Sequence, residues 1–103
     1  MVTGARAAFK SGRTKSISFR RQQLESLLRL YEENTEELLR ALEKDLRKPR
    51  FEAYLYEIVL LIRDVKSVLK NLNRWTKPTK VSKNLLSLSD SISYAAEPYG
   101  VVR

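Results

Sequence analysis

Carboxylates at close spacing are the side chains of this sequence best suited to chemistry. Three acidic pairs lie in one short stretch: Glu32/Glu36, Glu33/Glu37 and Glu36/Glu37. Paired carboxylates can act as general acid and base, but only where burial or a neighbouring charge shifts their pKa values. These pairs lie off the apolar positions of the surrounding sequence, so they are predicted to form solvated surface.

Two further acids, Glu57 and Asp64, have Lys or Arg at helical spacing and are predicted to form ordinary i,i+4 ion pairs. Tyr54, Tyr56 and Trp75 could stack on bases or bind a ligand. No glycine-rich approach or aromatic ladder accompanies these three residues, so packing in a core or an interface is the favoured interpretation.

The most restrictive feature is that the chain has no cysteine and no histidine. Thiolate nucleophiles, disulfides and Ser-His or Cys-His pairs are therefore excluded, and only carboxylates remain as metal ligands. No GxGxxG, GxxxxGK[ST], HExxH or CxxC pattern is present. The sequence thus predicts no catalytic, cofactor-binding or metal-binding residue on this chain.

Few chain breakers separate the elements that would position these side chains, because the sequence has only three Gly and three Pro. Apolar periodicity predicts a short helix over residues 3–10, stopped at Ser11-Gly12. A second helix is predicted to begin at an N-cap, Ser18. A third is predicted to restart at a capping box of Asn34 and Glu37, and to end before Pro49. Its apolar stripe is predicted to comprise Leu38, Ala41, Leu42 and Leu46.

The clearest predicted element is a fourth helix over residues 51–75. Its apolar positions alternate spacings of four and three: Phe51, Leu55, Ile58, Ile62, Val65, Leu69 and Leu72. So wide an apolar face must be covered, or it would be a binding surface. After Pro78 the pattern changes, and two short strands are predicted at about residues 84–89 and 91–97, with Val101-Val102 beginning another.

The net charge of +8 is unevenly distributed. Residues 1–24 and residues 65–89 each contain six Lys or Arg and no acid. Such blocks can bind nucleic acid or anionic membrane, and an independent basic helical interaction module is therefore an alternative function. Solvated faces, or patches matched by acids elsewhere, are the commoner explanation. The first block also has the composition of a mitochondrial transit peptide.

Taken in order, several segments resemble the amino-terminal arm of the class 3 aldehyde dehydrogenases, the family that includes the fatty aldehyde dehydrogenases. They are residues 6–14, 19–25, 41–48, 51–54, 57–58 and 71–72, then Trp75, residues 83–85 and residues 97–102. No single segment is specific, but the ordered series covers nearly the whole chain. Because the first helix falls inside the family's mature arm, the resemblance disfavours the transit-peptide interpretation.

The resemblance implies a mainly α fold of three or four helices followed by a short β-hairpin. Residues 1–77 would be a helical arm, and residues 78–103 a linker, hairpin strands and the start of the sheet of an NAD- or NADP-binding domain. Family members oxidise aldehydes to carboxylic acids through a cysteine thiolate, and medium-chain, long-chain or aromatic substrates are expected. The cysteine and the cofactor segments follow the point where this sequence ends, so the chain alone is predicted to be inactive.

The resemblance also places the long fourth helix near the mouth of the family's aldehyde tunnel. Tyr56 and Leu60 are the candidate lining residues, although neither lies in a recognisable motif. The implied partners are the rest of a dehydrogenase chain and a second subunit of a homodimer, with no nucleic acid. The implied location is the cytoplasm, and any membrane attachment would lie outside this segment.

Overall fold

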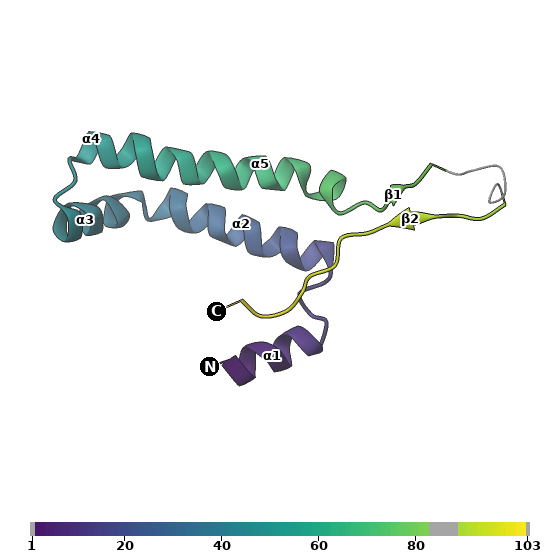
Figure 1. Cartoon of the computed structure of the whole chain (residues 1–103). Helices are drawn as coiled ribbons and strands as arrows, with labels where there is room; N and C mark the ends of the chain where they lie inside the picture. Colours follow the sequence, from purple (N-terminus) through teal and green to yellow (C-terminus); the bar gives the residue numbers. More distant parts are fainter. Residues whose placement is uncertain (1, 83–88, 103) are drawn as a thin grey trace.

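The computed structural model describes residues 2–82 and 89–102. Within these residues five α-helices and one π-helical turn precede a two-stranded sheet (Figure 1). The predicted mainly α fold with a short β-hairpin is therefore confirmed. The Cα radius of gyration is 19.7 Å, well above the roughly 13 Å of a compact chain of about 100 residues. The molecule is elongated, and much of its apolar surface is uncovered.

The first two helices follow the predicted boundaries closely. Helix α1 spans Val2–Lys10 and stops at Gly12, which has φ +73°, a left-handed conformation that glycine adopts without a Cβ clash. Helix α2 spans Ile17–Glu33, and its N-cap is Ser16. The prediction that Ser18 caps this helix is wrong, because the Ser16 hydroxyl accepts the Phe19 N–H at 3.4 Å.

Helix α3 spans Thr35–Leu46, after a break at Asn34. The predicted capping box is wrong, because the Asn34 side chain makes no cap hydrogen bond and instead donates back to the Leu30 carbonyl at 2.9 Å. The predicted stripe is also only half right. Leu39 is the buried residue of α3, Leu38 and Leu42 pack against it, and Leu46 is 67% exposed.

A continuous helical segment from Arg50 to Trp75 replaces the fourth predicted helix. It consists of α4 (Arg50–Ala53), the π-helical turn η1 (Tyr54–Ile58) and α5 (Val59–Trp75). In η1 the Val59 N–H bonds to the Tyr54 carbonyl, an i→i+5 bond. Such a turn contains one residue more than an α turn, so it rotates the preceding residues relative to α5.

The π turn explains why the first residue of the predicted apolar stripe does not lie on the buried face of the helix. Ile58, Val65 and Leu72 are buried as predicted, whereas Phe51 is 74% exposed. A regular α-helix would place residue 54 behind Ile58, but the extra residue brings Ala53 there, and Ala53 is 0% exposed. Ala53, Ile58 and Leu39 form the buried core cluster.

Helices α2 and α5 lie side by side and antiparallel, and α3 and α4 meet at one end of this pair (Figure 1). Lys66 pairs with Glu32 at 2.8 Å near that end, and Arg21 donates to the Leu69 carbonyl and the Asn73 side chain farther along. Helix α1 lies apart from the α2–α5 pair (Figure 1).

The two strands that the structure describes are β1 (Thr79–Lys80) and β2 (Ser93–Tyr94), which pair antiparallel with Thr79 opposite Tyr94. Of the predicted strand 84–89, residues 84–88 lie outside the described residues. Within the predicted strand 91–97, only Ser93 and Tyr94 are in a strand. Val101 and Val102 are not in a strand, because no partner backbone lies beside them among the described residues.

No helix among residues 2–82 and 89–102 is long and apolar enough to cross a bilayer.

Candidate functional site

Residues from α2, α3, α4 and η1 form the part of the molecule where polar groups and an apolar groove meet. The turn between α3 and α4 is tight because Arg47 has φ 52° and Pro49 precedes α4 directly. Arg47 donates its backbone N–H to the Glu43 carbonyl, which closes α3. This turn places the start of α4 against the start of α3.

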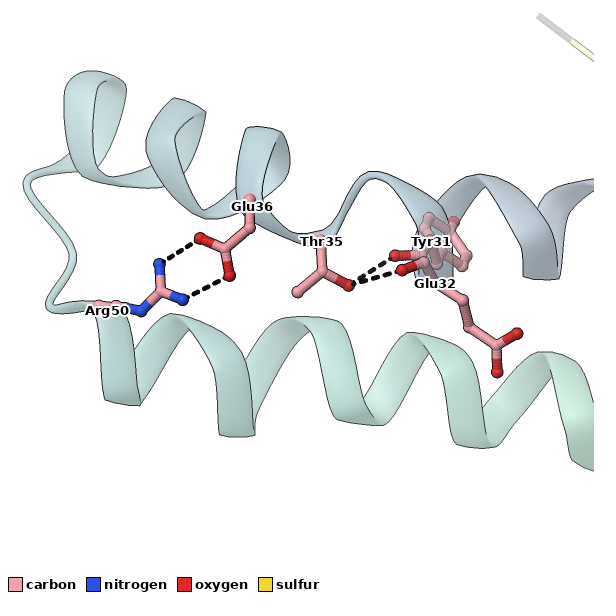
Figure 2. Close-up of polar contacts among 5 residues, drawn as sticks. All are labelled: Tyr31, Glu32, Thr35, Glu36 and Arg50. Atoms are coloured by element: carbon pink, nitrogen blue, oxygen red, sulfur yellow. Dashed lines mark hydrogen bonds and ion pairs between the residues drawn. The ribbon is translucent and has the colours of Figure 1, made fainter.

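An ion pair fastens this turn. The Arg50 guanidinium donates two hydrogen bonds to the two carboxylate oxygens of Glu36, with Nη1 2.7 Å from Oε2 (Figure 2). This bidentate arrangement fixes orientation as well as distance. The hydrogen bond from Arg50 lowers the pKa of Glu36, and the same contact raises the pKa of Arg50. Glu36 thus carries a negative charge matched to one specific cation.

The side chain of Thr35, the first residue of α3, forms hydrogen bonds with the last turn of α2. Its hydroxyl donates to the Tyr31 carbonyl at 2.8 Å and lies 3.4 Å from the Glu32 carbonyl (Figure 2). Those carbonyls belong to the last turn of α2, where helical partners are lacking. Thr35 and Asn34 therefore satisfy the end of α2 and set the angle at which α3 leaves it.

A second ion pair joins Lys48, at the turn, to Glu57, in η1. The hydrogen bond that the Lys48 ammonium donates to the Glu57 carboxylate raises the pKa of Lys48. The prediction that Glu57 makes an i,i+4 pair is therefore wrong, because its partner lies nine residues away across the turn. The same prediction is wrong for Asp64, whose ion-pair partner among residues 2–82 and 89–102 is its neighbour Arg63, at 3.8 Å.

The predicted acidic pairs do not act as pairs. Glu32 pairs with Lys66 and Glu36 pairs with Arg50, so two of the four carboxylates hold other helices. Their exposure is as predicted, since the Glu36 side chain is 65% exposed. The hydrogen bond from Arg50 lowers the pKa of Glu36, so this carboxylate is unsuited to general acid catalysis at neutral pH. The residues that the structure describes contain no cluster of three metal-binding side chains.

Beside these ion pairs an apolar groove of about 390 Å³ lies between α3 and the η1–α5 segment. Its volume falls in the range of small-molecule pockets. Most of its lining is apolar, with two carboxylates: Tyr31, Leu38, Ala41, Leu42, Asp45, Leu46, Glu57, Ile58 and Leu61. The predicted stripe residues Leu38, Ala41, Leu42 and Leu46 therefore come together here, at an open surface instead of in a closed core.

The two candidate tunnel residues do not line this groove. Tyr56 lies in η1 and is 64% exposed, and Leu60 is half-buried in the first turn of α5. Any tunnel would need walls from residues outside this chain, so their role stays a prediction. Sequence reasoning missed Leu39, the π turn and both ion pairs across the α3–α4 turn, and the 14-residue separation of Glu36 and Arg50 gives no periodic signal.

We expect the Glu36–Arg50 pair to make stability depend on pH in the acidic range. The folded-state pKa of Glu36 is lowered, so its contribution is present above the unfolded pKa and is lost as pH falls through the folded pKa. Urea unfolding followed from neutral to acidic pH should show a smaller acid-dependent loss for Glu36→Gln than for the unchanged chain. The matched control is Glu33→Gln, an exposed carboxylate of α2, which should follow the unchanged chain. Parallel pH profiles for Glu36→Gln and the unchanged chain would contradict the assignment.

Comparisons with known proteins identify the family. No protein-family model matches the chain. The chain is 41% identical over 102 residues to an aldehyde dehydrogenase of Craterostigma plantagineum, in an alignment that covers 99% of the chain and 21% of that protein. It is 44% identical over 97 residues to aldehyde dehydrogenase family 3 member B1 of Mus musculus, covering 94% of the chain and 21% of that protein.

A third relative, aldehyde dehydrogenase family 3 member A2 of Macaca fascicularis, is 38% identical over 101 residues, which are 98% of the chain and 21% of that protein. The similarity thus runs through every helix described above and through the β1–β2 ribbon. By sequence this chain belongs to the class 3 aldehyde dehydrogenase family. It spans about a fifth of the length of the relatives that it matches.

Proposed function

We propose that this chain is the helical arm of an NAD- or NADP-dependent aldehyde dehydrogenase that oxidises medium-chain, long-chain or aromatic aldehydes to carboxylic acids. The observation that carries the proposal is the 37–45% identity to class 3 enzymes over nearly the whole chain. In that family the nucleophile is a cysteine thiolate, and this chain has no cysteine. The chemistry would therefore be supplied by residues outside the chain.

The arm's own residues do not fit a nucleotide cofactor. Dinucleotide sites of this kind hold the pyrophosphate on a glycine-rich turn at the start of a helix. The three glycines here are Gly4, Gly12 and Gly100, which are far apart and form no such turn. The arm is accordingly a structural part of the enzyme, and the cofactor is bound elsewhere.

The uncovered apolar side chains support a structural role. Phe51 is 74% exposed, Tyr56 64% and Leu46 67%. Exposed apolar side chains gathered at one end of a molecule are typical of a surface that packs on another unit. We propose that this end of the arm packs on the rest of the dehydrogenase, with Tyr56 and Leu60 facing the aldehyde entrance, and that the enzyme is a cytoplasmic homodimer.

The test is NADH formation, followed at 340 nm with long-chain and aromatic aldehydes. The purified 103-residue chain should form no NADH from NAD and no NADPH from NADP. A longer protein that contains this arm and the family's catalytic segments should form one of these products. In that longer protein, Tyr56→Ala should change KM for long-chain aldehydes more than kcat, because a residue at the entrance contacts the substrate's tail. Ser26→Ala, an exposed α2 residue, is the control. NADH formation by the 103-residue chain would overturn the proposal.

A further inference from the structure

The outer face of α5 carries a row of cations. Arg63, Lys66, Lys70 and Arg74 lie on α5, and Lys77 follows two residues after its end; all five are exposed. The four residues of α5 are three, four and four residues apart, so on a helix of 3.6 residues per turn they occupy one stripe. Lys77 adds a fifth cation just beyond the end of the helix. We call these five residues the α5 basic stripe.

The stripe lies on the side of α5 away from its buried apolar residues, and Lys66 reaches from it to Glu32 of α2. Val65 and Leu72, the buried residues of α5, lie on the other side of the helix, and the one acid of α5, Asp64, is off the stripe. Helix α5 is therefore amphipathic with an apolar face that is covered and a basic face that is open. A basic amphipathic helix of this kind is typical of binding to an anionic surface.

The charges of the stripe are only partly matched within the chain. Lys66 pairs with Glu32 at 2.8 Å. Among the residues that the structure describes, no carboxylate forms an ion pair with Lys70, Arg74 or Lys77. Like charges at i,i+4, such as Lys66, Lys70 and Arg74, destabilise a helix. The helix dipole offsets this cost for Arg74 near the C-terminus, but not for Lys66 and Lys70.

Exposed aromatic and aliphatic side chains at and beyond the C-terminal end of α5 distinguish two kinds of anionic partner. Trp75, at the end of α5, is 54% exposed, and Tyr94 of the neighbouring β ribbon is 64% exposed. Val81 and Ile92, which flank β1 and β2, are 41% and 42% exposed. Trp and Tyr favour the membrane–water interface, and aliphatic side chains gain from contact with acyl chains. Aliphatic groups gain little from phosphates, and single-stranded nucleic acid is bound by rows of stacking aromatics.

We propose that the α5 basic stripe, with the aromatic and aliphatic side chains at its C-terminal end, is a docking surface for an anionic lipid bilayer. The cations contact the lipid headgroups, and Trp75, Val81, Ile92 and Tyr94 enter the headgroup region. The bilayer is contacted from one side, without a spanning helix. This surface is separate from the apolar groove between α3 and α5 and does not depend on dehydrogenase activity.

Trp75 makes the proposal directly testable, because it is the only tryptophan of the chain. The probes are vesicles of phosphatidylcholine alone and vesicles in which part of it is replaced by phosphatidylserine. Adding the anionic vesicles to the 103-residue chain should shift Trp75 emission to shorter wavelength, and co-sedimentation should show binding that weakens as salt rises. The neutral vesicles should produce neither effect.

Two charge variants with the same net charge separate the stripe from general basicity. The stripe variant combines Lys70→Gln, Arg74→Gln and Lys77→Gln, which leaves the Lys66–Glu32 pair intact. The control variant combines Arg29→Gln, Arg40→Gln and Lys44→Gln, three exposed cations of α2 and α3. Far-UV circular dichroism confirms that both remain helical. The stripe variant should lose about a hundredfold in vesicle affinity, and the control less than about threefold.

Equal losses in the two variants would overturn the proposal, since net charge would then explain the binding. Equal affinity for neutral vesicles, or no binding to anionic vesicles at low salt, would overturn it too. Tighter binding to a DNA or RNA oligonucleotide than to anionic vesicles would show that the stripe serves a nucleic acid instead. None of these outcomes bears on NADH formation by the longer enzyme, so the two proposals fail independently.

Discussion

Replacing Ile58 with alanine should lower the free energy of unfolding by about 2–4 kcal/mol. Ile58 is only 1% exposed and lies in the core cluster with Leu39 and Ala53. Truncation removes buried methyl and methylene groups and leaves a cavity that two short helices and a π turn can close only partly. In a chain that buries so few large side chains, this is a large share of the total stability.

The measurement is urea unfolding of both chains, followed by circular dichroism, with Leu46→Ala as the matched control. Leu46 is 67% exposed on the neighbouring α3, so its truncation should change the free energy of unfolding by less than about 0.5 kcal/mol. If both variants lose the same stability, the core cluster does not lie where the structure places it.

Enlarging Ala53 to leucine should destabilise the chain by about 1–3 kcal/mol, even though leucine is a good helix former. Ala53 is 0% exposed because the π turn brings it behind Ile58, against Leu39 of α3. A larger side chain there must push α3 away from α4. The displacement would also stretch the Glu36–Arg50 ion pair that fastens the turn.

Ala41→Leu on α3 is the control for this second experiment. Ala41 is exposed at the edge of the apolar groove, where three added carbons meet solvent-accessible space and should be tolerated. Urea unfolding of the two variants, measured side by side, separates them. The prediction fails if Ala53→Leu is as stable as Ala41→Leu, because a regular α-helix would have left residue 53 off the buried face.

The Ala53 prediction depends on the π turn, which nothing in the sequence indicates. The alternation of fours and threes from residue 51 to residue 72 fits one uninterrupted α-helix. The structure follows that pattern from Ile58 onwards and departs from it before Ile58. One additional residue in η1 places a small side chain, Ala53, where α3 approaches most closely and leaves Phe51 74% exposed. Apolar periodicity predicts which face of a single helix is buried. The close approach of α3 determines that Ala53, and not residue 54, lies on the buried face here.

For the ion pairs too, the sequence determined which charged residues are present, and the tertiary structure decided which of them pair. The sequence determined that Glu32 and Glu36 lie off the apolar positions and that Glu57 belongs to an ion pair. Their partners, Lys66, Arg50 and Lys48, were decided by how α3 turns back onto α4. Such pairs depend on the direction in which the chain leaves a turn, here through the left-handed Arg47. Spacing along one helix contains no information about that direction.

The sequence by itself determined the helical class, the end of α1 just before Ser11-Gly12, the end of α5 at Trp75 and the family. These features depend on local backbone preference and on residues read in order. It also determined that no cysteine or histidine chemistry resides in this chain, because that follows from composition alone. Only the tertiary structure decided which face of α3 is buried, which strands pair, and that the basic residues of α5 stay exposed. Those features require two segments to be placed against each other, and contacts between segments distant in sequence are what the fold adds.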